Sequence, residues 1–170
     1  MLDSIIQTWL AVQRTWSYLK PIFKYSEDIR RQLPEDTKRF EIIDQSWTAE
    51  MNKAVLTPNA LVVADHKEFF NTLEQDQKGL VKCEKALSDY LDTKRRLFPR
   101  FYFVSSSDLL DILSKGQQPR LVEKHLSKIF DNIHSLKWEN PDDIECKTAV
   151  SFLSGEKEEV PFTQPFKCIN

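Results

Sequence analysis

Residues 65–98 read DHKEFFNTLEQDQKGLVKCEKALSDYLDTKRRLF, and this stretch decides the fold. Its apolar residues recur every three or four positions, at Phe69, Leu73, Leu80, Cys83, Leu87, Leu91 and Phe98. The spacing predicts a helix over about 65–98, because residues three and four apart share one side of an α-helix. Unbroken, such a helix would reach roughly 50 Å at 1.5 Å per residue. We therefore expect a mainly α protein, a packed helical bundle with one long helix.

The apolar stripe of this helix is interrupted near its middle. Gln77 stands where an apolar residue is expected, and Gly79 follows two positions later. Glycine in a helix interior costs roughly 1 kcal/mol relative to alanine. We therefore expect either a bend or a contact site at 77–79.

Shorter helices are predicted on both sides of the long one. The same spacing, together with caps and breakers, places them at 2–19, 26–33, 35–55, 109–114 and 122–136. Pro21 is expected to end the first, because proline lacks the backbone N–H that a helix interior uses. Ser26 is a candidate cap for the second. The break after the third falls at 57–59, and Trp138 is expected to end the last.

A small β element is predicted from two stretches. Phe98–Val104 is an aromatic run around Pro99 that favours a short buried strand, with Phe101 and Phe103 in the core. The C-terminal part alternates between apolar and polar residues, which predicts a hairpin of 148–152 and 159–162 around a turn at 154–157.

The composition is that of an ordinary globular protein. Hydrophobic residues make up 41% and charged residues 29% of the 170 positions. The 24 basic and 26 acidic side chains give a net charge of -2. The chain therefore lacks the excess positive charge that attracts proteins to nucleic acid. No apolar run reaches the roughly 20 residues of a membrane span. We expect neither nucleic acid nor membrane as a partner.

The domain organisation is left open by the sequence alone. One lobe over 1–170 and two sub-lobes at 1–64 and 65–170 both fit the pattern of helices and breaks. The last residues, 166–170, look like a strand or turn in progress, which indicates an excised fragment.

No residues with the spacing of a catalytic, cofactor or metal site stand out. The three glycines lie far apart and none is followed by Lys-Ser or Lys-Thr, so no phosphate-binding loop is predicted. The histidines and cysteines show no metal-ligand spacing; they are His66, His125, His134, Cys83, Cys146 and Cys168. Three scattered cysteines fit a reducing compartment better than a disulfide framework. We expect no catalytic residue, no cofactor and no metal.

The strongest concentration of positive charge is Lys94, Arg95 and Arg96, with Arg100 close behind and aromatic residues around it. Basic residues next to aromatic ones can bind nucleic acid. Cations also belong in the last turn of a helix, where the dipole is negative, and a cationic patch can instead contact an anionic or protein partner. The helix-end role is favoured, with Lys94, Arg95 and Arg96 kept as a candidate partner contact.

Three tryptophans lie on predicted apolar stripes: Trp9, Trp16 and Trp47. Tryptophan on a stripe is more often part of a core than of a binding surface. A tryptophan at an exposed edge would instead suit the docking of a partner.

Several stretches of the chain follow one another in an order that matches a known protein family. The first is residues 9–23, WLAVQRTWSYLKPIF, with Trp9, Gln13 and Trp16 as its matching residues. The strongest motif is residues 87–105, LSDYLDTKRRLFPRFYFVS, and 108–113, DLLDIL. The matching residues there are Lys94, Arg95, Phe98, Pro99, Arg100, Phe101, Tyr102, Phe103, Leu109 and Leu110. In this order the stretches resemble the linker region of dynein heavy chains, and the sequence of residues 32–40, QLPEDTKRF, is most similar to axonemal chains of the outer-arm β type.

The resemblance implies a fragment of the linker, the helical lever that couples ATP-driven changes in the AAA+ ring to movement along microtubules. It implies as partners the AAA+ ring modules of the same heavy chain and other dynein subunits, in the axoneme of a cilium or flagellum. The ATPase would belong to the full heavy chain and not to this segment. The alternatives are a generic helical adaptor or scaffold that binds a partner through an exposed stripe, and an enzyme without a recognisable motif. The turn SGEKEE at 154–159 is more acidic than the family pattern, which puts a charge-specific contact there in doubt.

Overall fold

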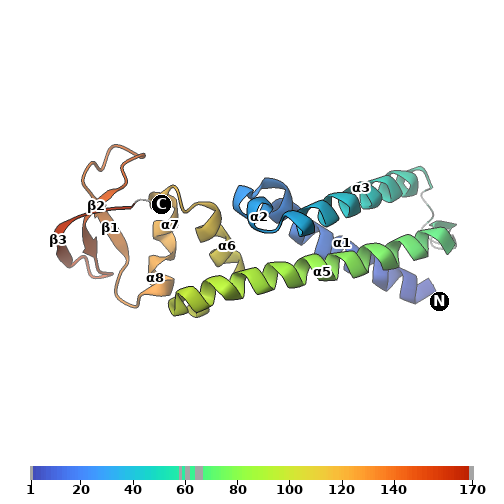
Figure 1. Ribbon diagram of the computed structural model, residues 1–170, viewed down its shortest axis with the longest axis horizontal. Coiled ribbons are helices and arrows are strands. Elements are labelled where there is room, and N and C mark those ends of the chain that lie inside the picture. Colours follow the sequence, from blue (N-terminus) through green and yellow to red (C-terminus); the bar gives the residue numbers. More distant parts are fainter. Residues whose placement is uncertain (1, 58, 60–61, 64–66, 169–170) are drawn as a thin grey trace. The chain divides into compact units, whose positions relative to one another are not determined.

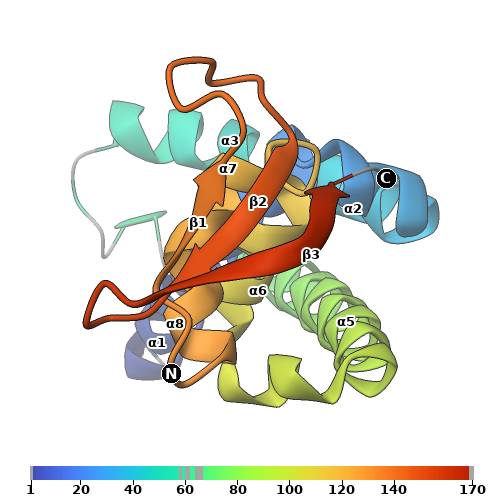
Figure 2. The same ribbon diagram turned by 90° about the vertical axis from the view of Figure 1, so that its left-hand side faces the viewer.

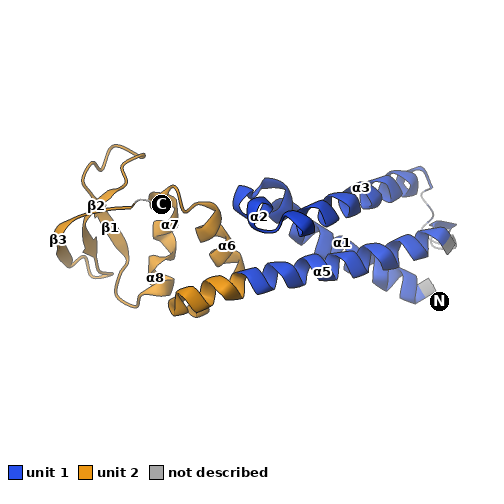
Figure 3. Cartoon of the chain, viewed as in Figure 1, with its two compact units in different colours: residues 1–90 blue, residues 91–170 orange. Residues whose placement is uncertain are grey.

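The computed structural model describes residues 2–57, 59, 62–63 and 67–168. They form two compact units, Met1–Tyr90 and Leu91–Asn170 (Figure 3). The boundary between these units falls inside the long helix. Pro58, His66, Ile169 and Asn170, which entered the sequence-based expectations, lie outside the described residues.

The elements that the structure describes in the first unit are all helices (Figure 1). They are α1 (Leu2–Tyr25), α2 (Glu27–Gln32), α3 (Pro34–Leu56) and α5 (Lys67–Leu97), whose last turns belong to the second unit. Ser26 caps α2 as predicted, its side chain accepting the N–H of Ile29. Tyr90 of α5 donates to Asp28 of α2 at 2.5 Å. The helical elements predicted at 26–33, 35–55 and 65–98 are confirmed within two residues at each end.

The expectation that Pro21 ends the first helix is wrong, because α1 continues to Tyr25 with the proline inside it. Pro21 is exposed, while Leu19 and Phe23 on either side of it are 0% and 1% exposed. The Phe23 ring stacks on Phe40 of α3 with centroids 5.4 Å apart. Burial of these two side chains offsets the one hydrogen bond that proline removes.

The middle of α5 is a contact site, as one of the two expectations for 77–79 proposed. A Cβ at Gly79 would lie 2.6 Å from Cδ1 of Ile43 on α3, closer than side chains approach one another. The polar residue on the buried stripe is Asp76 and not Gln77, since Asp76 is 6% exposed and Gln77 is half-buried. The interruption in the apolar stripe therefore marks a place where Ile43 of α3 packs directly against the backbone of α5.

Replacing Gly79 by valine is expected to lower the free energy of unfolding by about 1–3 kcal/mol, because extra methyl groups must be forced against the buried Ile43. Gly155→Ala is the control, since nothing lies within 4 Å of a Cβ at that position, and it should change stability by less than about 0.5 kcal/mol. Urea melts of the three proteins measure the difference. Equal midpoints for Gly79→Val and the parent chain would contradict the close approach of the two helices.

The second unit combines short helices with a three-stranded sheet (Figure 2). Its helical elements are η1 (Pro99–Phe103), α6 (Ser106–Ser114), α7 (Pro119–Val122), η2 (Glu123–His125) and α8 (Leu126–Ile129). The strands are β1 (Ser135–Trp138), β2 (Thr148–Leu153) and β3 (Glu159–Lys167), antiparallel in the order β1-β2-β3. Trp138, Cys146 and Ala149 form a small buried cluster on the sheet.

The predicted C-terminal hairpin is confirmed, and its turn falls where it was expected. The N–H of Ser154 donates to the carbonyl of Glu158 at 2.9 Å, and Lys157 rather than Gly155 has positive φ, at 66°. Glu159, the first residue of β3, accepts from Lys137 of β1 and from Ser151 of β2. One carboxylate thus links all three strands.

Two other expectations for this unit are wrong. The run after Pro99 is not a strand but the 3-10 helix η1, with the N–H of Phe101 donating to the carbonyl of Phe98 at 2.9 Å. Aromatic residues favour strands where a neighbouring strand offers a pleated surface, and η1 pairs with none of the three strands. The helix expected at 122–136 is three short pieces that end at Ile129, followed by β1. Glu123 stabilises the packing of η2 against β1, because its carboxylate accepts hydrogen bonds from the Leu136 N–H and the Trp138 Nε1–H.

Candidate functional site

The residues 94–110 form a connected structural element, the signature segment, which runs from the end of α5 through η1 into α6. Lys94, Arg95 and Arg96 occupy the last turn of α5, where the helix dipole favours cations. Arg95 Nη1 donates to Asp92 at 2.9 Å, and its Nη2 donates to Ser106 of α6, also at 2.9 Å. Arg95 therefore ties α5 to the start of α6 across the turn.

Arg100 holds the turn from the other side. Its Nη1 donates to the carbonyl of Ile129 at 3.1 Å, and its guanidinium lies 4.8 Å from the centre of the Phe130 ring. The rings of Phe98 and Phe101 meet edge to face with centroids 4.9 Å apart. Arg95 and Arg100 are thus used inside the unit, while Arg96 is exposed.

The aromatic residues of the signature segment do not enter the core, which corrects the sequence-based expectation. Phe103 is 76% exposed and Tyr102 is 60% exposed, and Phe101 is only half-buried. The core of this region is supplied by Val104 at 4% and Leu109 at 0% exposure. Because η1 has nearly three residues per turn, successive side chains point to different sides, and this leaves two of the three aromatics on the surface.

Four large apolar side chains within residues 97–103 are exposed, and we refer to them together as the aromatic patch: Leu97, Phe98, Tyr102 and Phe103. Phe98 is the least exposed member, at 39%. Large apolar side chains exposed singly are ordinary, whereas several within seven consecutive residues mark a candidate interaction surface.

A network of charges joins α6 to the helices that follow it. His125 is 4% exposed and lies between two carboxylates, with Nε2 at 2.9 Å from Asp111 Oδ2 and Nδ1 at 3.5 Å from Asp108 Oδ1. Lys115 and Lys124 lie within 2.8 Å of Asp111. These two lysines and then His125 lower the pKa of Asp111.

Asp108 has a second role at the start of α6. Ser105 caps this helix by accepting the N–H of Asp108, and its hydroxyl donates back to the Asp108 carboxylate at 2.7 Å. Lys128 of α8 also contacts this carboxylate at 2.9 Å, and together with Ser105 it lowers the pKa of Asp108. Carboxylates with lowered pKa stabilise the fold at neutral pH, and that contribution is lost in acid as they become protonated. The cluster therefore fixes α6, η2 and α8 to one another.

The N-terminal family residues lie in the first unit. Trp9 meets Phe69 edge to face at 4.9 Å, and Trp16 donates from Nε1 to Asp44 of α3 at 2.9 Å. Trp47 is 2% exposed, whereas Trp9 and Trp16 are half-buried and Gln13 is exposed. These tryptophans thus join α1 to α3 and α5.

Asp76 is a residue that the sequence pattern did not single out. Its carboxyl group is buried between α5 and α3 and accepts from the Ser46 hydroxyl at 3.1 Å. Burial raises the pKa of Asp76 to about 6, against the opposing effect of the Ser46 hydrogen bond. The available signal was its position, three residues after Leu73 and four before Leu80, on the same stripe.

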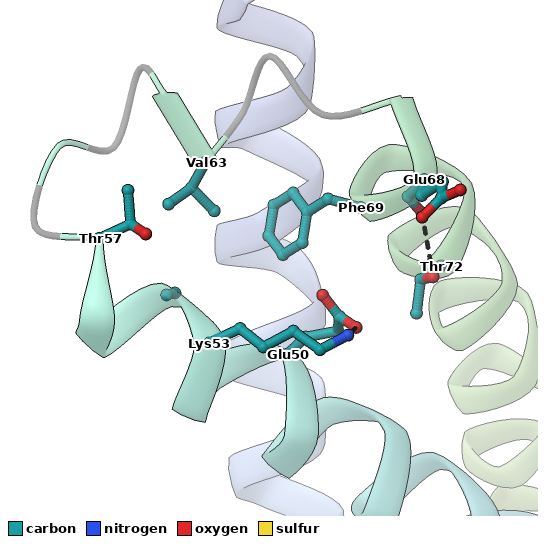
Figure 4. Close-up of a pocket in the computed structure, with 8 residues that line it drawn as sticks. Glu50, Lys53, Thr57, Val63, Glu68, Phe69 and Thr72 are labelled. Carbon is teal, nitrogen blue, oxygen red and sulfur yellow. Dashed lines mark hydrogen bonds and ion pairs between the residues drawn. The ribbon is translucent and has the colours of Figure 1, made fainter.

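A cavity of about 770 Å³ lies in the first unit between the end of α3 and the start of α5 (Figure 4). Its lining residues are Glu50, Lys53, Ala54, Thr57, Val63, Glu68, Phe69 and Thr72. Lys53 is paired with Glu50 at 2.7 Å, and the Thr72 hydroxyl donates to the Glu68 carbonyl. The polar groups of the lining thus contact one another. Within the described ranges no three His, Cys, Asp or Glu side chains gather as metal ligands.

Comparison with known proteins identifies the family. The family model for the dynein heavy chain, N-terminal region 2, matches residues 1–170. The chain belongs to the dynein heavy chain family. It is 52% identical over 170 residues to the ciliary dynein beta chain of Heliocidaris crassispina, with 98% of this chain covered. It is 52% identical over 161 residues to dynein axonemal heavy chain 17 of Mus musculus, and 43% identical over 168 residues to the flagellar outer-arm dynein beta chain of Chlamydomonas reinhardtii, covering 94% and 98% of this chain.

This dynein heavy chain segment spans about 4% of the length of each of these relatives. Both stretches that carried the resemblance, 9–23 and 87–113, fall inside the matched region. None of the helices in the part of the chain that the structure describes is long and apolar enough to cross a membrane.

Proposed function

We propose that this segment is a non-catalytic, mechanical part of the dynein linker, the lever that couples ATP-driven changes in the AAA+ ring to movement along microtubules. The observation that carries the proposal is the match of the whole chain to the N-terminal region of dynein heavy chains. The packing of its helices supports it, because a close-packed interior switches between discrete arrangements and does not deform continuously.

In this proposal the signature segment is a stiff joint. Arg95 and Arg100 anchor both sides of the η1 turn through hydrogen bonds from charged groups, which are stronger than those between neutral groups. The charge network around His125 fixes α6 to the next helices. A force that acts on η1 is therefore carried to α6 and to the helices that follow it by several bonds at once.

The aromatic patch is the proposed contact surface for the AAA+ ring modules of the same heavy chain. Tyr102 and Phe103 are the most suitable residues, because exposed aromatic side chains supply large contact area at little entropic cost. Arg96, exposed beside the patch, is the proposed cationic contact of the basic cluster.

The proposed role extends to the whole motor. The segment works without a cofactor of its own, and ATP is hydrolysed by other modules of the heavy chain. It acts in the axoneme of a cilium or flagellum together with other dynein subunits, a role supported by its similarity to ciliary and flagellar dynein beta chains. Nucleic acids and membranes are not partners.

The double variant Tyr102→Ala/Phe103→Ala in the heavy chain that carries this segment tests the proposal. Both side chains are exposed, so the fold is retained while the proposed contact is lost. Microtubule gliding velocity is expected to fall several-fold, with basal ATP turnover per motor within about twofold of the parent. Ile144→Ala, which removes another exposed apolar side chain of the same unit, is the control and should leave both quantities unchanged.

An unchanged gliding velocity in the double variant would contradict the proposed contact. If the segment were instead an adaptor, the double variant would no longer bind a separate partner protein, while the gliding velocity per ATP hydrolysed would stay constant. ATP turnover by residues 1–170 alone, above background, would contradict the non-catalytic role.

A further inference from the structure

We propose that Cys146 and Cys168 are a redox-active pair that forms a reversible disulfide when the motor meets a hydroperoxide. Both are free thiols in the structure, and both contact the small cluster of Trp138 and Ala149 on the sheet. The sequence placed these cysteines far apart and suggested no pairing between them. The hairpin brings them to the same end of β2 and β3.

A backbone hydrogen bond places Cys168 next to the neighbour of Cys146. The N–H of Cys168 donates to the carbonyl of Lys147 at 2.8 Å, so Cys168 lies opposite the residue that follows Cys146. With neighbouring strands about 4.8 Å apart and about 3.3 Å per residue, a neighbour one step along lies roughly 6 Å away. That separation is within the range of Cα–Cα distances that disulfides span.

The side chains lie on a common side of the sheet. In a regular ladder, residues 146 and 168 would point to opposite faces. Cys146 precedes β2, however, and its Sγ turns back to within 3.7 Å of the Thr148 carbonyl. Both thiols therefore reach the Trp138–Ala149 cluster.

The two thiols have different chemical environments. Backbone hydrogen bonds of Thr148 and Asn140, and then Arg120, lower the pKa of the Cys146 thiol. Burial, and then the nearby Cys146, raise the pKa of Cys168. Because the thiolate is the nucleophile, Cys146 is the residue that reacts first and Cys168 the one that resolves.

The reaction balances with a hydroperoxide as the oxidant. The Cys146 thiolate attacks one peroxide oxygen, the O–O bond breaks, and the products are a sulfenic acid at Cys146 and an alcohol or water. Cys168 then attacks this sulfur, the S–S bond forms, and hydroxide leaves as water after taking up the proton of the Cys168 thiol. Two electrons pass from the two sulfurs to the peroxide, and an external thiol reverses the step.

Cys83 provides an internal control. It is 0% exposed on α5, and burial raises its pKa to about 11. A thiol that has no exposed surface and a raised pKa is inert toward peroxide, whereas Cys146 is 9% exposed and the pKa of its thiol is lowered.

The test treats the intact heavy chain with hydrogen peroxide, blocks the remaining thiols, and digests the chain with trypsin without reduction. Mass spectrometry is expected to find the peptide 138–147, WENPDDIECK, joined to the peptide that begins at Cys168 and lighter by two hydrogens than the sum of the two. The linked peptide should form at least about ten times faster than Cys83 is oxidised.

Three variants sharpen the result. Cys168→Ser should abolish the link and leave a sulfenic acid at Cys146 that a 1,3-diketone reagent captures, Cys146→Ser should abolish both, and Cys83→Ser should change neither. Oxidation of Cys146 and Cys168 to separate sulfinic acids, without a linked peptide in the parent chain, would overturn the proposal. So would oxidation of Cys83 at the same rate as Cys146.

Discussion

Leu109→Ala lowers the free energy of unfolding by about 2–5 kcal/mol, the largest expected effect of a single change in the signature segment. Leu109 is 0% exposed in the first turns of α6, so truncation removes buried apolar area and leaves a cavity that its neighbours cannot fill completely. Urea melts measure the loss, and amide exchange of α6 reports it locally.

Phe103→Ala is the matched comparison within the same segment. Its side chain is 76% exposed, so the change in the free energy of unfolding should stay below about 1 kcal/mol. The sequence pattern placed the Phe103 side chain in the core and therefore predicted a large loss of stability for Phe103→Ala. A loss at Phe103 that equals or exceeds the loss at Leu109 would contradict the packing of the segment.

Asp76→Asn raises the stability of the first unit at pH 7, by up to about 3 kcal/mol. Burial raises the pKa of Asp76 from 3.8 to about 6, and each pKa unit corresponds to about 1.4 kcal/mol. Between these two values the folded state binds more protons than the unfolded state, so stability contributed by this group is present in acid and is lost as the pH rises through 6. Asparagine has no charge to desolvate and still accepts the hydrogen bond from Ser46.

Melts of the parent and the variant across pH 4 to 8 measure the effect as a gap in the free energy of unfolding that widens from about pH 4 to about pH 6 and stays constant above pH 6. Glu84→Gln is the control, because Glu84 is exposed on the same helix and its substitution should shift stability by less than about 0.5 kcal/mol at every pH. A variant that is less stable than the parent at pH 7 would show that the Asp76 carboxylate is compensated by its surroundings.

Local signals predicted much of the helical architecture. Spacing of Phe40, Ile43 and Trp47 placed α3, and Ser26 with its acidic followers placed α2, because periodicity and caps act within a few residues. Turn residues at 154–157 likewise placed the hairpin.

The features that the sequence did not predict depend on contacts between distant residues. Pro21 stays inside α1 because Phe23 packs on Phe40, and β1 forms because Glu123 binds the backbone of Leu136 and β2 offers a partner strand. The exposure of Phe103 follows from the absence of a partner strand beside η1 among the strands that the structure describes. Tertiary packing overrides local propensity in each case.

For the signature segment, the sequence predicted the protein family better than it predicted the local structure. Residues 87–113 carried the strongest motif of the resemblance, and the family that it indicated is confirmed over residues 1–170. The sequence could not show which of these residues are buried, paired or exposed. Their environment depends on the positions of Ser106, Ile129 and Phe130, which lie up to 30 residues further along the chain than Arg100.

The most direct test of the mechanical role is a distance measurement in the working motor. A fluorophore at position 155, where the chain leaves open space, is paired with a second one on an AAA+ module of the same heavy chain, and energy transfer is recorded through the nucleotide cycle. A lever predicts at least two transfer efficiencies that interchange with ATP binding and product release. A single efficiency in all nucleotide states, in a motor that still moves microtubules, would contradict the role proposed for this segment.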